Sequence, residues 1–108
     1  MTMTRTEALA QLTTPGAPHE LQAMTINNVP CRVFANAPES LRELFSENLS
    51  DETFVVYQDE RYTFAQMYQQ ACRLATCLQD QYGVVKGDRV AISMRNYPEW
   101  ILAFMATT

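Results

Sequence analysis

The stretch that decides the fold spans residues 61–106 and reads RYTFAQMYQQACRLATCLQDQYGVVKGDRVAISMRNYPEWILAFMA. Its first part predicts a long helix that begins at Thr63, because the Thr63 hydroxyl can cap the helix while Gln66 reaches back to it. Apolar residues recur there at steps of three and four, the spacing of one buried helix face. The members of that face are Phe64, Met67, Tyr68, Ala71, Leu74, Ala75 and Leu78. Gly83 supplies the left-handed residue that ends such a helix.

The second part of the stretch predicts a turn, a strand and another helix. Residues 85–88 are typical of a type II turn, with Gly87 at the position that needs a positive φ. Residues 89–94 then alternate large apolar with small side chains, which favours a strand covered on both faces. Pro98 opens the last helix, and Tyr97 before it is forced into an extended conformation and caps the helix.

Upstream of this stretch the sequence predicts a β-hairpin. Residues 21–26 and 31–34 have the composition of strands, and Asn27-Asn28 between them tolerates the left-handed conformation of a tight turn. We expect residues 1–20 to form a flexible N-terminal segment with a short, weakly held helix. The reason is that residues 13–18 read as a linker, with two prolines and one glycine.

The order of elements predicts an α/β fold. A helix opens within residues 37–40, and a strand follows over 53–57 with a short antiparallel return at 61–62. The long helix and the strand at 89–94 then form a crossover, which joins parallel strands. We therefore expect an incomplete parallel sheet with flanking helices, plus the N-terminal hairpin. Two parallel strands cannot bury both faces of a sheet, so further strands must come from elsewhere.

Composition excludes several classes of protein. The chain has 108 residues, 47% hydrophobic and 19% charged, which is typical of a folded domain and not of disorder. The net charge is −4 and no basic stripe exists, so nucleic-acid binding is excluded as a function. Only three glycines occur, and no two lie close enough for a phosphate-binding loop.

The cysteines and the apolar runs indicate a cytoplasmic protein. Three cysteines without a signal peptide suit a reducing compartment, and we interpret Cys31, Cys72 and Cys77 as small packing residues. A single histidine and the lack of a CxxC pair argue against a metal site. The longest apolar run, Trp100 to Ala106, is far below the ~20 residues of a membrane span, so no transmembrane segment is expected.

Taken in order, the motifs of residues 27–106 resemble the N-terminal region of AMP-forming acyl-CoA synthetases, the adenylate-forming ligase superfamily. The motifs are Thr63-Phe64, Arg73-Leu74-Ala75, Gly83-Val84, Lys86-Gly87-Asp88-Arg89-Val90-Ala91-Ile92 and Asn96-Tyr97-Pro98-Glu99-Trp100. Upstream, VFANAP (33–38) and SLR (40–42) are similar to the N-termini of fatty-acid–CoA ligases. The resemblance implies the N-terminal part of the large subdomain of such an enzyme.

The resemblance also implies a reaction. Family members activate a carboxylic acid with ATP and magnesium, forming an acyl-adenylate and pyrophosphate, and then transfer the acyl group to coenzyme A. We expect the acid to be a fatty acid. ATP, magnesium and coenzyme A are implied for the full-length enzyme, and none is expected to bind to this fragment itself.

No catalytic, cofactor-binding or metal-ligating residue of the family can be assigned here. The family's phosphate loop and catalytic lysine lie downstream of the matched region, and we place Lys86 in a surface turn. Arg95 and Asn96 are the candidate site residues, as a border of the substrate or coenzyme A cleft, because ligands of open α/β sheets bind beyond the carboxyl ends of strands. The alternative is that Asn96 shapes the loop and Arg95 is solvated.

Two hypotheses about the chain follow. In the first, residues 21–108 are a truncated N-terminal portion of an AMP-binding (adenylation) domain, inactive alone, whose partner is the missing remainder of that domain. The last helix is still running at Thr108, which favours this hypothesis. In the second, the chain is a stand-alone interaction or regulatory module derived from such an enzyme. It would then bind a protein through an exposed sheet edge and the stripe of Trp100 and Phe104.

Overall fold

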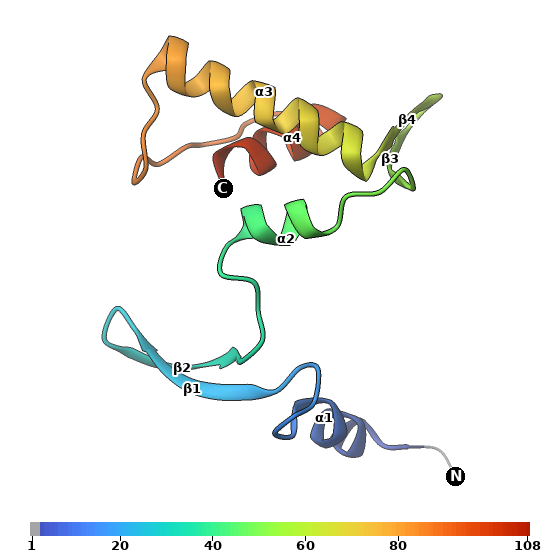
Figure 1. The fold of residues 1–108 in the computed structure, drawn as a ribbon, viewed down its shortest axis with the longest axis vertical. Coiled ribbons are helices and arrows are strands. Elements are labelled where there is room, and N and C mark those ends of the chain that lie inside the picture. The colour runs from blue at the N-terminus through green and yellow to red at the C-terminus, as the bar shows by residue number, and fades with distance from the viewer. Residues whose placement is uncertain (1–2) are drawn as a thin grey trace. The chain divides into compact units, whose positions relative to one another are not determined.

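The computed structural model describes residues 3–108, which fall into two compact units that divide after Pro38 (Figure 1). The first unit contains α1 (Arg5–Thr13), β1 (Leu21–Ile26) and β2 (Val29–Phe34). The second unit contains α2 (Leu41–Glu47), β3 (Thr53–Tyr57), β4 (Glu60–Thr63), α3 (Phe64–Tyr82) and α4 (Pro98–Thr107). The chain is therefore a mixed α/β protein, in which both sheets of the described residues are two-stranded and antiparallel.

The first unit contains the predicted hairpin. β1 pairs with β2, and the turn between them holds Asn27 at φ 49° and Asn28 at φ 64°, the left-handed conformation that asparagine tolerates. Pro30 lies inside β2 opposite Thr25, which a two-stranded sheet allows because both strands are edges.

The N-terminal helix α1 lies within the segment predicted to be flexible. Thr4 caps this helix: its hydroxyl accepts from the Glu7 backbone N–H, and the Glu7 carboxylate accepts from the Thr4 N–H at 2.8 Å. The carboxylate also accepts from the Thr4 hydroxyl, and these hydrogen bonds lower the pKa of Glu7. The flexibility of residues 1–20 stays a prediction, and its first two residues lie outside the described part.

The long helix α3 forms as predicted, with both of its end signals in place. At its start the Gln66 N–H donates to the Thr63 hydroxyl (3.1 Å) and the Thr63 N–H donates to the Gln66 side chain (2.9 Å). At its end Gly83 adopts φ 68°, a left-handed conformation. The turn that follows places Gly87 at φ 101°, and the Asp88 N–H donates to the Val85 carbonyl.

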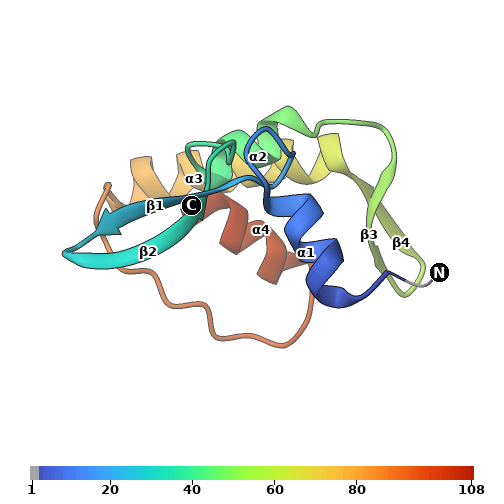
Figure 2. The same ribbon diagram turned by 90° about the horizontal axis from the view of Figure 1, so that it is seen from below.

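Residues 89–94, which are predicted to form a strand, form none within the part of the chain that the structure describes. These residues lie in the long loop between α3 and α4, drawn as plain coil in Figure 2. A strand requires a neighbour to accept and donate its backbone hydrogen bonds, and β3 pairs with β4 instead. Within residues 3–108 the backbone of 89–94 finds no such neighbour, so Val90 and Met94 are each 45% exposed. The parallel sheet is therefore not confirmed.

The core of the second unit is small and lies where β3, α3 and α4 meet. Its buried members are Val55, Met67, Ala71 and Met105, and six partly buried side chains pack against it. Met67 is fully buried. The helix α4 contacts both α3 and α2, with the rings of Phe45 and Phe104 meeting edge to face. This packing fixes the start of α4 beside the end of β3.

Candidate functional site

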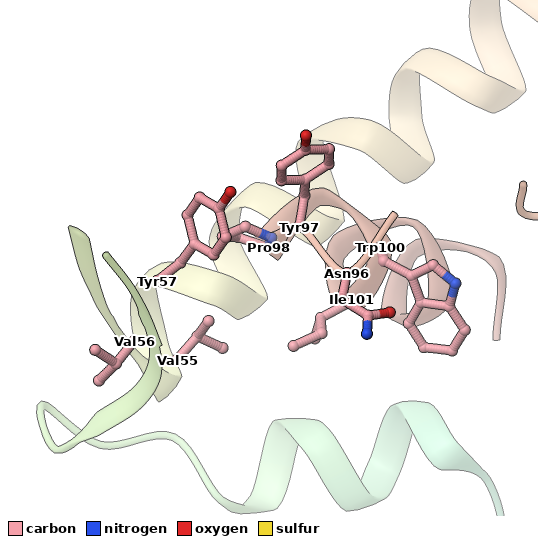
Figure 3. A pocket seen from close by; sticks show the side chains of 8 residues that line it. All are labelled: Val55, Val56, Tyr57, Asn96, Tyr97, Pro98, Trp100 and Ile101. Atoms are coloured by element: carbon pink, nitrogen blue, oxygen red, sulfur yellow. The ribbon is translucent and has the colours of Figure 1, made fainter. Parts of the chain in front are cut away.

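A cavity of about 260 Å³ opens between the end of β3 and the start of α4 (Figure 3). Its lining is mostly aliphatic and aromatic. The lining residues are Val55, Val56, Tyr57, Asn96, Tyr97, Pro98, Trp100 and Ile101. The cavity therefore lies between the last three residues of β3 and the first turn of α4.

A short turn before α4 positions the residues at the mouth of this cavity. Pro98 is the first helical residue, and it holds Tyr97 in an extended conformation with φ −101° and ψ 161°. The Tyr97 N–H donates to the Arg95 carbonyl at 2.8 Å, and the Tyr97 carbonyl accepts from the Trp100 N–H at 3.0 Å. These bonds fix the loop where it enters the helix.

Aromatic contacts define two walls of the cavity. The rings of Tyr57 and Tyr97 meet edge to face with centroids 5.6 Å apart, which joins the end of β3 to the loop before α4. The Trp100 ring stacks on Phe104 at 5.8 Å, so one of its faces is covered within α4 while 39% of its surface stays exposed. Such an arrangement suits contact with an apolar group.

The polar groups of the cavity are neutral. Asn96 contributes the only side-chain amide of the lining, and the tyrosines contribute hydroxyls. No lining residue carries a charge, so the described cavity offers no cation to hold a carboxylate or a phosphate. The lining matches an uncharged group better than an anionic one.

The two candidate residues predicted from the sequence differ in their relation to the cavity. Both residues are exposed, but Asn96 lines the cavity and Arg95 does not. The residues that sequence reasoning missed are Tyr57 and Tyr97, which were interpreted only as a strand residue and a helix cap. The two rings meet because β3 packs near the start of α4 in the tertiary structure. The sequence around each tyrosine does not indicate this contact.

Other polar residues form no catalytic arrangement in the part of the chain that the structure describes. The Tyr62 hydroxyl donates to Glu60 at 2.6 Å, and this bond, with the negative charge of Glu60 and Glu99, raises the pKa of Tyr62. The phenol therefore stays protonated and is no nucleophile near neutral pH. Lys86 lies in the turn before residues 89–94.

Residues 3–108 contain neither a metal-ligand cluster nor a membrane-spanning helix. No group of three or more His, Cys, Asp or Glu side chains among residues 3–108 could hold a metal ion. The cysteines Cys31, Cys72 and Cys77 are all free. None of the described helices has the length and hydrophobicity to cross a bilayer.

The chain is similar to a known enzyme family and to several known proteins. Residues 15–108 match the family model described as AMP-binding enzyme. The chain is 42% identical over 52 residues to an acetyl-coenzyme A synthetase of Mesorhizobium japonicum, and 46% identical over 50 residues to that of Rhizobium meliloti. It is 45% identical over 51 residues to the acetyl-coenzyme A synthetase of Vibrio cholerae serotype O1.

These matches cover little of the relatives. They involve 48%, 46% and 47% of this chain, but in each case 8% of the relative's length. No solved structure matches the chain significantly.

Proposed function

Because the chain belongs to the AMP-binding enzyme family, we propose that it is the N-terminal part of an ATP-dependent carboxylic acid–CoA ligase. The observation that carries this proposal is the family match over residues 15–108, which includes every element from β1 to α4. In the proposed reaction the carboxylate attacks the α-phosphorus of ATP, giving an acyl-adenylate and pyrophosphate. The thiol of coenzyme A then displaces AMP and forms the thioester.

The proposal also assigns residues 89–94 to the parallel sheet that the sequence predicts. Residues 89–94 alternate large and small side chains, and their backbone is unpaired within residues 3–108. In the proposed enzyme this segment pairs as a parallel strand with residues of the same adenylation domain that lie outside the chain. Val90 and Met94 are exposed within the described residues. Pairing with the rest of the domain would cover this segment and bury both side chains, so their exposure supports the proposal.

Two observations bear on the acid substrate. The similarity of residues 33–42 to fatty-acid–CoA ligases favours a fatty acid. The relatives named acetyl-coenzyme A synthetase favour acetate instead, over about half of the chain. Both acids therefore belong in the assay of the proposed enzyme.

The chain alone is proposed to be inactive. Its three glycines are dispersed and its one lysine lies in a turn, so it offers neither a phosphate loop nor a cation in the cavity. The chain by itself is proposed to bind none of ATP, magnesium and coenzyme A, which bind to the full-length enzyme. The free cysteines are compatible with the proposed cytoplasmic location.

A second candidate function is a protein-interaction module. Exposed Val90, Met94 and Trp100, together with the unpaired backbone of 89–94, would suit a partner that adds a strand and covers the apolar stripe. The alternative requires that the chain functions without the rest of an adenylation domain.

One experiment separates the two functions. We would determine whether the reading frame continues past Thr108, and then measure ATP–pyrophosphate exchange for its complete product and for residues 1–108, with acetate and with a long-chain fatty acid. The ligase proposal expects exchange from the complete product and none from residues 1–108. A stop codon directly after Thr108 would contradict it and favour the module, and exchange by residues 1–108 would refute the proposed inactivity.

Arg95 and Asn96 remain proposed as a border of the substrate or coenzyme A cleft. The position of Asn96 in the cavity lining supports this proposal, and Arg95 is its neighbour in the chain. In the complete product we expect Asn96→Ala to raise a KM several-fold with little change in melting temperature. Lys86→Ala, in the exposed turn before residues 89–94, is the control. An unchanged KM for every substrate would contradict the proposal that Asn96 borders the cleft.

A further inference from the structure

We draw no further inference here: the strongest candidate, the apolar cavity between the end of β3 and the start of α4 with Tyr97 and Trp100 exposed beside it, belongs to the site already described, and nothing in the structure shows what covers it.

Discussion

At the scale of single residues, Met67 is the most completely buried side chain of the second unit. It is fully buried on α3, within the core cluster that also contains Val55 of β3 and Met105 of α4. An unbranched thioether side chain fills an irregular space between a strand and two helices well. Because the hydrophobic core of this unit contains only four buried residues, each contributes a large share of its packing.

We therefore predict that Met67→Ala strongly destabilises the second unit. The lost methylene and sulfur contacts and the cavity left behind cost about 2–5 kcal/mol in unfolding free energy, which is much of the stability of a unit this small. Urea denaturation followed by circular dichroism measures the change. Met94→Ala is the matched control, since Met94 is 45% exposed and its truncation should change the free energy by less than about 0.5 kcal/mol.

A second variant keeps this prediction testable if Met67→Ala fails to fold. Met67→Leu conserves volume and should cost less than about 1.5 kcal/mol. Equal effects of Met67→Ala and Met94→Ala would contradict the packing described here.

At the scale of elements, the helices and turns with local signals form as predicted, whereas the strand predicted over residues 89–94 does not form among the described residues. The capping box of Thr63 and Gln66 and the left-handed Gly83 fix the ends of α3 through hydrogen bonds between residues at most six apart. The Asn27-Asn28 turn likewise fixes the hairpin of β1 and β2. Residues 89–94 have the right side-chain pattern for a strand, but a strand also requires a neighbour, which no local pattern supplies.

The candidate site was predictable to the same limited extent. Asn96 is a candidate from the sequence because it follows a predicted strand and precedes a helix opened by proline, and the structure places it in the lining of the cavity. The contact of Tyr57 with Tyr97 depends on how β3 packs against α4 and on 39 intervening residues of chain, so only the tertiary structure reveals it.

The cap of α3 gives a prediction at this scale. Thr63→Ala removes the hydroxyl that accepts from the Gln66 N–H, and should lower the unfolding free energy by about 1 kcal/mol. Thermal unfolding measures the effect. Thr63→Ser keeps the hydroxyl and should retain most of the stability, whereas equal losses for both variants would show that the methyl group and not the cap is responsible.

At the scale of the whole molecule, the chain is a family member whose apolar surface is only partly covered by its own residues. The core of the second unit buries few side chains, while Val90, Met94 and Trp100 remain accessible. The match to AMP-binding enzymes explains this if the chain contributes one part of a larger adenylation domain. The proposed function requires that these residues can replace the matching segment of an acyl-CoA synthetase.

Acetate-dependent ATP–pyrophosphate exchange by a chimera tests that claim most directly. In the acetyl-coenzyme A synthetase of Vibrio cholerae serotype O1, the matched segment would be replaced by the corresponding residues of this chain, which are 45% identical to it. The matched control carries Met67→Ala as well, which should lower the melting temperature of the chimera. We predict that the chimera retains exchange within about tenfold of its parent, a change of about 1.4 kcal/mol in activation free energy. A chimera that folds with the parent's melting temperature but shows no exchange would contradict the account.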